Sequence, residues 1–554
     1  MSYLEAQSVS YTLAGGQPLL RDISFHVSPQ ERVAVIGANG AGKTTLLRIL
    51  AGELPPDTGT VACNGSIGVM RQFVNSGTVQ ELLLSVAPPT LQKVATRLRY
   101  IEQAVANTGS IDQQIEYAST LAAWEERGGY DLEVLWNMCT TDSLGMTFQE
   151  CWNRPISTLS GGEQKRLILN ALLRGSDDLL FLDEPDNFLD IPGKRWLENR
   201  LVECNKSVLY ISHDRELLAN TATKIVTLEL GKAGNTAWVH SGDFSEYHKA
   251  RAKRVEKIEE QQHRWNDEHE KLRSLVQMYK RKSAYNSDMK SRYRAAQTRL
   301  ARFEQTGPPE AQPRTQNLAM RLHGGRTGKK TLTCKELEIT GLVYPFSFQA
   351  WYGDRIAILG ENGSGKSHFL RLLADGGDNP AGEHKPVTEL QIEPVPHNGT
   401  ACLGARVRPG WFAQTHGRPD LYGRSLLSIL HRGDKHRQGM PREESSRALA
   451  RYELASSGEQ NFETLSGGQQ ARFQILLLEL GGATMLLLDE PTDNLDLESA
   501  EALQRALESY SGTVIAVTHD RWFARDFDRF LVFTKDGQAY ETDHPIWNEP
   551  AKED

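Results

Sequence analysis

The sequence predicts an α/β protein made of two similar domains in tandem, joined by an antiparallel α-helical hairpin. Three observations carry this prediction. Nearly every motif occurs twice, and each half alternates short apolar runs with helical patterns, as layered domains with a mostly parallel sheet do. Between the halves lies a charged segment with apolar residues at helical spacing. We expect domains over residues 1–245 and 331–554, with the hairpin linker over 246–330.

The repeated motifs keep a constant distance along the chain. LSGGEQKRLILNALL begins at Leu159 and LSGGQQARFQILLLEL at Leu465. LLFLDEPDNFLD matches MLLLDEPTDNLD, ISHDR matches THDR, and 466−160, 490−184 and 519−213 each give 306. Earlier in the halves, GANGAGKTT and GENGSGKS are offset by 323. The two halves are therefore expected to share one architecture.

The halves differ in their inserts. From Gln72 to Ser160 is 88 positions, whereas from Gln414 to Ser466 is 52, so the first half carries 36 more. These residues have helical character around LQKVATRLRYIEQAV. The second half has its own Pro- and Gly-rich insert, GDNPAGEHKPVTELQIEPVPHNGTACLGARVR, where we expect loops or short strands.

Composition excludes several classes of protein. The six cysteines are scattered without a C-x-x-C pair, so neither a disulfide framework nor a zinc ribbon is expected, and a reducing compartment fits. The segment MSYLEAQSVSYTL lacks the basic and apolar regions of a signal peptide, and no run approaches the roughly 18 apolar residues of a membrane span. We therefore expect a soluble, cytoplasmic protein with no stable membrane insertion.

A phosphate-binding loop, G-x-x-x-x-G-K-[ST], occurs in each half after an apolar strand and before an apolar helix, a context that argues against a plain glycine-rich turn. Its glycines let the backbone wrap phosphates at a helix N-terminus. Lys43 and Lys366 are expected to reach the β- and γ-phosphates of a nucleotide, and Thr44 and Ser367 to place a hydroxyl on Mg²⁺. The other candidate phosphate contacts are Gly37, Asn39, Gly40, Gly42, Thr45, Gly360, Asn362, Gly363 and Gly365.

Acidic residues and histidines follow later strands at matched places. Asp183 and Asp489 end strands, where a buried carboxylate can hold Mg²⁺ through water. The next residues, Glu184 and Glu490, can polarise an attacking water. A lone histidine is more often structural, but one follows a strand at the same place in each half and is a catalytic candidate. These histidines are His213 and His519.

At L-S-G-G-[EQ] the sequence resembles the ATP-binding-cassette (ABC) ATPases, whose signature these residues match. The resemblance implies two P-loop ABC ATPase domains arranged head to tail within a monomer, with each ATP between one half's phosphate loop and the other half's signature. Both signatures open helices, so their amides can face a γ-phosphate. ATP would close the sandwich and hydrolysis would reopen it.

By this resemblance each ATP site combines residues of both halves. The first contains Lys43, Thr44, Gln72, Asp183, Glu184 and His213 with Ser466, Gly467 and Gly468. The second contains Lys366, Ser367, Gln414, Asp489, Glu490 and His519 with Ser160, Gly161 and Gly162. The Mg²⁺ ligands, partly through water, are Thr44, Gln72, Asp183, Ser367, Gln414 and Asp489.

Some positions depart from the family's pattern. Tyr11 suits the aromatic residue that stacks on adenine, whereas the second half is shortened there and Tyr344 is a weaker candidate. His368 replaces a small hydroxyl residue, and PDNFLD departs from the commoner PTNHLD. No catalytic group is missing, so we expect both sites to hydrolyse ATP.

The linker is basic in a chain whose formal charge is −8. Residues 249–304 hold 16 Lys and Arg against 8 Asp and Glu, and residues 271–302 hold ten against one. A first apolar stripe consists of Val255, Ile258, Trp265, Leu272, Val276 and Tyr279. A second consists of Met289, Tyr293, Ala296, Leu300 and Phe303. Two stripes separated by KRKSAYNSD predict an antiparallel hairpin, its first helix about 30 residues long and its second ended by GPPEAQP.

A solvated coiled-coil spacer is the simpler interpretation of a charged hairpin, but such spacers usually mix charges of both signs. Here the basic excess is one-sided, and Tyr279, Tyr285 and Tyr293 lie near the tip among arginines, a combination that stacks on unpaired bases and contacts RNA phosphates. Two of these tyrosines are also candidates for the apolar seam. The candidate RNA contacts are Lys280, Arg281, Lys282, Lys290, Arg292, Arg294 and Arg299.

Tandem cassettes joined by a basic hairpin resemble the ABC-F class. AQTRLARFE and GDFSEYHKARAKR look like that class's linker, and residues of about 75–155 match its arm subdomain. The resemblance implies a ribosome-binding ATPase that uses ATP and Mg²⁺. It would contact rRNA and tRNA near the tRNA exit site and the peptidyl-transferase centre, in translation regulation or antibiotic resistance. The alternative is the motor subunit of a transporter with separate membrane subunits; a DNA-acting ATPase is not expected.

Overall fold

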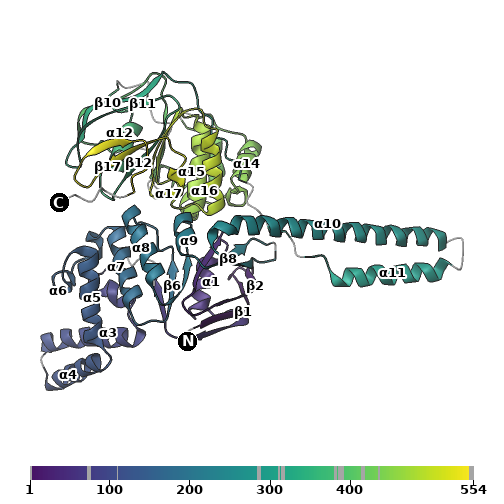
Figure 1. The fold of residues 1–554 in the computed structure, drawn as a ribbon, viewed down its shortest axis with the longest axis horizontal. Helices are drawn as coiled ribbons and strands as arrows, with labels where there is room; N and C mark the ends of the chain where they lie inside the picture. Colours follow the sequence, from purple (N-terminus) through teal and green to yellow (C-terminus); the bar gives the residue numbers. More distant parts are fainter. Residues whose placement is uncertain are drawn as a thin grey trace.

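The protein consists of two α/β lobes, one above the other, with a long helical hairpin projecting from between them (Figure 1). We call β1–β9 with α1–α9 the first lobe and β10–β18 with α12–α17 the second lobe. The computed structural model describes residues 3–70, 77–108, 110–231, 233–283, 289–309, 312–313, 318–379, 384, 392–413, 418–434 and 437–547.

A six-stranded sheet forms the centre of the first lobe, in the order β5-β6-β7-β3-β8-β9. All neighbours in it are parallel except β8 and β9. A three-stranded antiparallel sheet, β2-β1-β4, lies beside it. The strands are β1 (Tyr3–Thr12), β2 (Pro18–Val27), β3 (Arg32–Gly37), β4 (Thr58–Asn64), β5 (Ile67–Met70), β6 (Leu179–Asp183), β7 (Ser207–Ile211), β8 (Lys224–Glu229) and β9 (Thr236–Ser241).

Helices cover both faces of this sheet. Strand β7 is buried along its whole length, as apolar strands of a doubly covered parallel sheet are. One face packs on α1 and the antiparallel sheet. The other packs on α7 to α9 and the inserted helices. The helices are α1 (Lys43–Leu50), α2 (Val79–Ser85), α3 (Pro89–Thr108), α4 (Ile111–Glu126), α5 (Gly129–Leu144), α6 (Phe148–Cys151), the 3₁₀ turn η1 (Ile156–Thr158), α7 (Gly161–Arg174), α8 (Ile191–Glu203) and α9 (Arg215–Thr221).

The second lobe repeats this plan with the sheets β14-β15-β16-β12-β17-β18 and β11-β10-β13. Its strands are β10 (Lys330–Ile339), β11 (Val343–Trp351), β12 (Arg355–Gly360), β13 (His397–Leu403), β14 (Pro409–Phe412), β15 (Met485–Asp489), β16 (Thr513–Val517), β17 (Arg529–Phe533) and β18 (Ala539–Thr542). Its helices are α12 (Lys366–Ala374), η2 (Pro419–Leu421), α13 (Leu426–Arg432), α14 (Arg442–Arg451), η3 (Ala455–Ser457), η4 (Phe462–Thr464), α15 (Gly467–Gly481), α16 (Leu497–Glu508) and α17 (Arg521–Ala524).

The segment predicted as an insert forms helices in the first lobe, and the one in the second lobe contains a strand in its described part. In the first lobe α3 and α4 pair and extend away from the sheets at the lower left of Figure 1. In the second lobe the Pro- and Gly-rich insert contributes β13, which pairs with β10. The shared plan of the two lobes confirms the predicted α/β repeat.

The hairpin consists of α10 (Phe244–Ser283), which has 40 residues, and α11 (Met289–Thr306). The predicted length of about 30 residues is too short, and at 1.5 Å per residue α10 spans about 60 Å. The extra turns at its start arise because Phe244 and Tyr247 are buried in the first lobe's core. Helix α10 also continues through Ser283, into the segment expected to separate the two stripes. The division at residue 245 stays a prediction, since α10 begins just before it.

Candidate functional site

Each phosphate loop is a tight turn between a buried strand and a helix. In the first lobe, Gly42 caps α1 with φ of 94°, a conformation that favours glycine. The Lys43 ammonium donates to the carbonyl oxygens of Gly37 at 2.9 Å and Ala38 at 3.1 Å. Burial lowers the pKa of Lys43, while Asp496, Glu184 and Asp183 act to raise it.

The second loop repeats this geometry. Gly365 caps α12 with φ of 94°. The Lys366 ammonium donates to the carbonyl oxygens of Gly360 at 2.8 Å and Glu361 at 2.6 Å. Both loops therefore hold a buried ammonium against their own backbone, at the start of a helix whose amides favour an anion.

The predicted magnesium ligands meet in pairs. The Ser367 hydroxyl donates to Asp489 Oδ1 at 3.1 Å, and Thr44 donates to Asp183. Burial raises the pKa of both aspartates, and these hydrogen bonds oppose the rise. A hydroxyl beside a carboxylate offers the hard oxygen donors that Mg²⁺ prefers. The other two predicted ligands, Gln72 and Gln414, lie outside the described residues.

The two predicted catalytic glutamates directly follow β6 and β15 in a left-handed backbone conformation. The φ angle is 49° for Glu184 and 47° for Glu490. Non-glycine residues rarely adopt this conformation, and such strain concentrates at functional sites. The surrounding sheet holds them there, because Glu184 N donates to the Ile211 carbonyl at 2.9 Å and Glu490 N to the Val517 carbonyl at 3.0 Å.

The glutamates have different partners. Glu490 Oε2 accepts from the His519 backbone N at 3.0 Å, and its Oε1 lies 3.4 Å from His519 Nε2. Burial, with nearby Asp493 adding to it, raises the pKa of Glu490 to about 8. Glu184 Oε2 instead accepts from the Asn187 side-chain amide at 2.6 Å.

The two predicted histidines differ in the same way. His519 Nε2 lies 3.1 Å from Asn362 Oδ1 of its own phosphate loop. Neither ring nitrogen of His213 has a hydrogen-bond partner among the described residues. Burial lowers the pKa of His213 to about 3, and the charge of Lys43 acts in the same direction. Burial also lowers the pKa of His519, so both histidines are neutral near pH 7.

Each phosphate loop contacts the opposite lobe. In one site, Asn39 N donates to Asp496 Oδ2 at 2.8 Å and Asn39 Nδ2 to the Asn494 carbonyl at 3.0 Å. In the other site, Asn362 Nδ2 donates to the Phe188 carbonyl at 3.2 Å. The loops following β6 and β15 thus bind the phosphate loops across the interface.

The signature motifs open α7 and α15 at these same places. Ser160 and Ser466 each cap their helix with a reciprocal capping box. A Cβ on Gly468 would come within 2.0 Å of Asn39 Nδ2, so this helix start lies against the phosphate loop of the other lobe.

A cavity of about 530 Å³ separates the Ser160 signature from the second phosphate loop. It is lined by Ser160, Gly161, Gly162, Asp186, Phe188, Leu189, Lys194, Leu342, Asn362, Gly363, Gly365, Lys366, Ser367, His368, Glu490, Asp493 and His519. Residues that the sequence assigned to one composite site therefore surround one cavity between the lobes.

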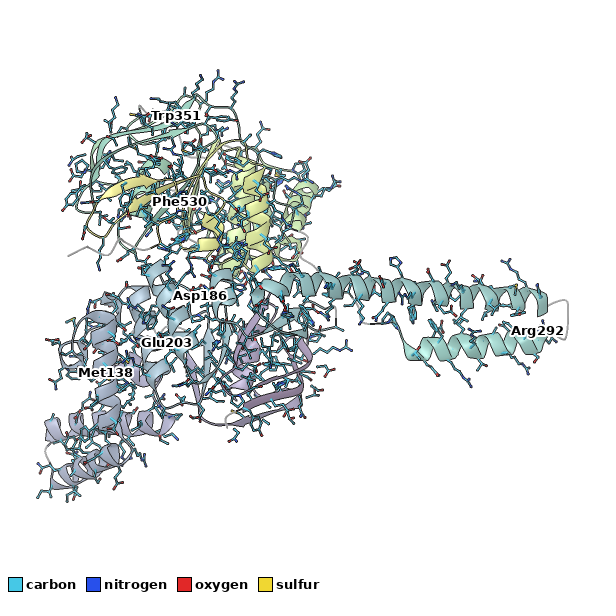
Figure 2. All side chains as sticks on the ribbon, in the orientation of Figure 1. Met138, Asp186, Glu203, Arg292, Trp351 and Phe530 are labelled. Carbon is cyan, nitrogen blue, oxygen red and sulfur yellow. The ribbon has the colours of Figure 1, made fainter. Side chains whose placement is uncertain are left out.

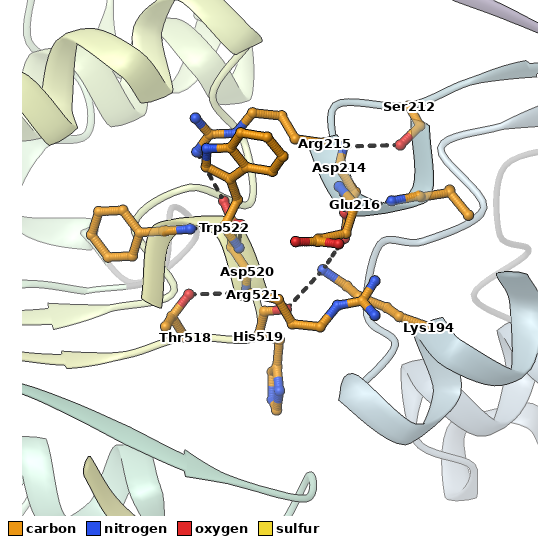
Figure 3. A network of polar contacts seen from close by, with 12 residues as sticks. Lys194, Ser212, Asp214, Arg215, Glu216, Thr518, His519, Asp520, Arg521 and Trp522 are labelled. Atoms are coloured by element: carbon orange, nitrogen blue, oxygen red, sulfur yellow. Dashed lines mark hydrogen bonds and ion pairs between the residues drawn. The ribbon is translucent and has the colours of Figure 1, made fainter. Parts of the chain in front are cut away.

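The structure adds cross-lobe contacts that motif analysis missed (Figure 3). Arg521 forms an ion pair with Glu198, and Arg215 lies 3.7 Å from Asp520. Lys194 of the first lobe donates to the His519 carbonyl of the second lobe at 3.3 Å. The repeated His-Asp-Arg triplet was the available signal for the arginines. No repeated motif indicated Lys194, because the equivalent position in the other half, 306 residues later, is Ala500.

The adenine-stacking candidates differ between lobes. Tyr11 is half-buried on β1 opposite Leu20, whose side chain packs near Gly42 of the phosphate loop. In the second lobe, Val343 packs near Gly365 as Leu20 packs near Gly42. The residue opposite Val343, in the place of Tyr11, is the buried Ile339. Tyr344 is 63% exposed and lies beside Gly537. No aromatic residue therefore occupies the place of Tyr11 in the described part of the second lobe.

Comparison with known proteins gives the family. The ABC transporter family model matches residues 20–187 and 343–493, which together exceed half of the chain. An "Antibiotic resistance protein" of Mycobacteroides abscessus is 55% identical over 99% of this chain and 100% of its own. The chain belongs to the ABC-F class of ATP-binding-cassette ATPases. Its two cassettes bind and hydrolyse ATP.

More distant ABC-F relatives align over most of the chain. "ABC transporter F family member 5" of Arabidopsis thaliana is 29% identical, covering 94% of this chain and 73% of its own. "Energy-dependent translational throttle protein EttA" of Haemophilus influenzae is 28% identical, covering 91% and 87%. No helix in the described parts of this ABC-F chain is long and apolar enough to cross a membrane.

Solved structures agree on the fold. The structure titled "Crystal structure of the complex of archaeal ribosomal stalk protein aP1 and archaeal ribosome recycling factor aABCE1" matches with a TM-score of 0.54 at 18% identity. The match covers 96% of the ABC-F chain and 89% of that chain. At this identity the likeness supports the tandem-cassette fold alone.

The hairpin of the ABC-F chain buries its apolar stripes and exposes its basic residues. Leu272 and Ala296 are buried where α10 and α11 pair, and Trp265 stacks on Phe303 with ring centroids 5.3 Å apart; Ile258, nearer the start of α10, is also buried. The predicted RNA contacts are all exposed; they are Lys280, Arg281, Lys282, Lys290, Arg292, Arg294 and Arg299. Figure 2 shows Arg292 close to the tip. Tyr285 lies outside the described residues.

Proposed function

We propose that the protein binds MgATP in two composite sites between the cassettes and hydrolyses it at both. Lys43 and Lys366 hold the phosphates, and Glu184 and Glu490 orient the attacking water. The pairs Thr44–Asp183 and Ser367–Asp489, reported above, support the placement of Mg²⁺, which would neutralise charge on the β- and γ-phosphates. The cavity bounded by one signature and the opposite phosphate loop supports the composite arrangement.

The partner in this proposal is the ribosome, and the hairpin is the element that contacts rRNA. The observation that carries it is the exposure of seven basic side chains on the outer half of a hairpin whose apolar residues face inward. RNA phosphates attract such a surface, and its charge stands out in an acidic chain. The names of two relatives, an "Antibiotic resistance protein" and a "translational throttle protein", support an action on translation in the cytoplasm.

Within the ribosome, we place the protein near the tRNA exit site with the hairpin directed toward the peptidyl-transferase centre. A hairpin about 60 Å long can reach well beyond the cassettes. Protection of the ribosome from an antibiotic fits best, because the relative named for antibiotic resistance is the more similar of the two. No observation favours the alternative of a transporter motor subunit over this function.

Co-sedimentation with ribosomes tests the proposal. The variant Glu184→Gln with Glu490→Gln should sediment with ribosomes when ATP is present, because ATP closes the cassettes and is not hydrolysed. In this background, Lys280→Ala, Arg281→Ala and Lys282→Ala together should weaken binding and reduce its salt dependence. The matched control removes three exposed arginines of the second cassette, Arg442, Arg447 and Arg505, and should bind as the parent does. A parent that stays free of ribosomes with ATP present would contradict the proposal.

A further inference from the structure

Lys194 lies at the interface where the two cassettes meet (Figure 3). It projects from α8 of the first cassette and is 6% exposed. Its ammonium lies 3.0 Å from Asp214 Oδ2 and donates to the His519 carbonyl of the other cassette at 3.3 Å. Burial alone would lower the pKa of Lys194, but Asp214 and three further carboxylates, Asp186, Asp493 and Asp520, raise it above its ordinary value. These carboxylates therefore stabilise the ammonium charge.

The contact reaches the hydrolytic residues of the second site directly. The backbone of His519 is held at both of its polar groups, since its N–H donates to Glu490 at 3.0 Å and its carbonyl accepts from Lys194. The imidazole of the same residue lies 3.1 Å from Asn362 of the phosphate loop. A lysine of the first cassette thus completes the surroundings of a histidine and a glutamate in the second.

At the first site, α16 carries no counterpart of Lys194. The residue at the matching position of α16 is Ala500, which is too short to reach across the interface. At this site His213 has no hydrogen-bond partner among the described residues, and Glu184 binds Asn187 rather than the histidine peptide. The two sites thus have the same motifs but different hydrogen bonds around the histidine and the glutamate.

We propose that Lys194 is a positioning residue, supplied by the first cassette, that holds His519 against Glu490 and so makes hydrolysis at the second site depend on closure of the cassettes. The first site hydrolyses without such a support. This inference rests on the proposed roles of Glu184, Glu490 and His519. It predicts that the two ATP sites respond differently to loss of a single cation that lies between them.

The test compares Lys194→Met in two backgrounds by single-turnover hydrolysis of ATP with Mg²⁺ present. With Glu184→Gln, only the second site turns over, and we expect the rate constant to fall about ten- to hundredfold, as for loss of one hydrogen bond to a charged group. ATP affinity is measured in parallel, because Lys194 also lines the cavity next to the second phosphate loop. A positioning role predicts that the rate constant falls more than the affinity does. With Glu490→Gln, the first site should keep its rate within about twofold.

Two further variants sharpen the result. Lys194→Arg keeps the charge and should restore part of the second-site rate, whereas Arg200→Ala, at a half-exposed position on the same helix, should leave both sites unchanged. Equal losses at both sites, or an unchanged second site, would overturn the proposal. If neither background hydrolysed ATP before Lys194 was changed, the assignment of the two glutamates would fail instead.

Discussion

The backbone N–H of His519 donates to the carboxylate of Glu490 at 3.0 Å, whereas His213 makes no such contact with Glu184 among the described residues. The same motif therefore produces a preassembled pair in the second site and separate residues in the first. A side chain whose position is fixed by hydrogen bonds needs no further ordering when the nucleotide arrives.

His519→Ala should therefore reduce hydrolysis more than His213→Ala does. We expect about a tenfold or greater loss of the single-turnover rate for His519→Ala when Glu184→Gln restricts turnover to the second site. The loss for His213→Ala, measured with Glu490→Gln, should be several times smaller. Equal losses would show that the difference in hydrogen bonding disappears when ATP binds.

The buried carboxyl of Glu490 should make stability depend on pH. Burial raises its pKa from 4.5 to about 8, so the folded protein binds a proton that the unfolded chain has released between these values. The contribution of this group to the free energy of unfolding is fully present below about pH 4.5 and is lost as the pH rises to about 8. Glu490→Gln removes this dependence, because a neutral amide replaces the group.

Thermal unfolding without nucleotide measures the effect. At about pH 8.5 the Glu490→Gln variant should unfold about 2–4 °C above the wild type, and at about pH 5.5 the two should be nearly equal. Glu508→Gln, at an exposed position, is the control and should show no such trend. A constant difference between variant and wild type across this pH range would contradict a protonated Glu490.

The sequence was sufficient for the tandem architecture because both lobes carry the same motifs at constant offsets. Phosphate loops, signature helices and strand-end carboxylates are local features with strong patterns, and Lys43, Ser160 and Glu490 lie at the places predicted for them. Asn39 and Asn362 were predicted as loop residues, and the structure adds their bonds to the opposite cassette.

The interface was not predictable in the same way. The Lys194 contact with His519 joins residues 325 positions apart, and nothing repeats it in the other half. The length of α10 was also underestimated, because its first turns owe their position to burial of Phe244 and Tyr247 rather than to a local pattern. Both features depend on tertiary packing, which overrides local propensity.

Close packing of the second signature against the first phosphate loop gives another prediction. A Cβ on Gly468 would lie 2.0 Å from Asn39 Nδ2 and 2.8 Å from the Asn494 carbonyl oxygen, closer than packed atoms allow. Gly468→Ala should therefore hinder closure of the first site. We expect about a tenfold loss of single-turnover hydrolysis in the Glu490→Gln background.

Gly161→Ala, at a less crowded signature glycine of the other half, is the comparison, since its Cβ would meet the Phe188 ring at 3.4 Å, an ordinary contact. Measured at the second site in the Glu184→Gln background, its loss should be clearly smaller than that of Gly468→Ala. A larger loss for Gly161→Ala would mean that the cassettes close in a different arrangement when ATP binds.

Weakening the apolar contacts between α10 and α11 should open the hairpin without unfolding the cassettes. Leu272 is 4% exposed and packs between α10 and α11, so Leu272→Ala removes buried contacts worth about 2–5 kcal/mol. Because α11 has only 18 residues and an exposed outer face, this loss should open it locally rather than unfold the lobes. Hydrogen exchange of the α11 amides should become at least about tenfold faster, while the amides of β3 and β12 keep their protection.

Ser274→Ala, on the exposed side of α10, is the control and should leave exchange unchanged. If α11 kept its protection in Leu272→Ala, the seam would not be what holds the basic residues in place, and a rigid hairpin could not be the reason that they reach RNA.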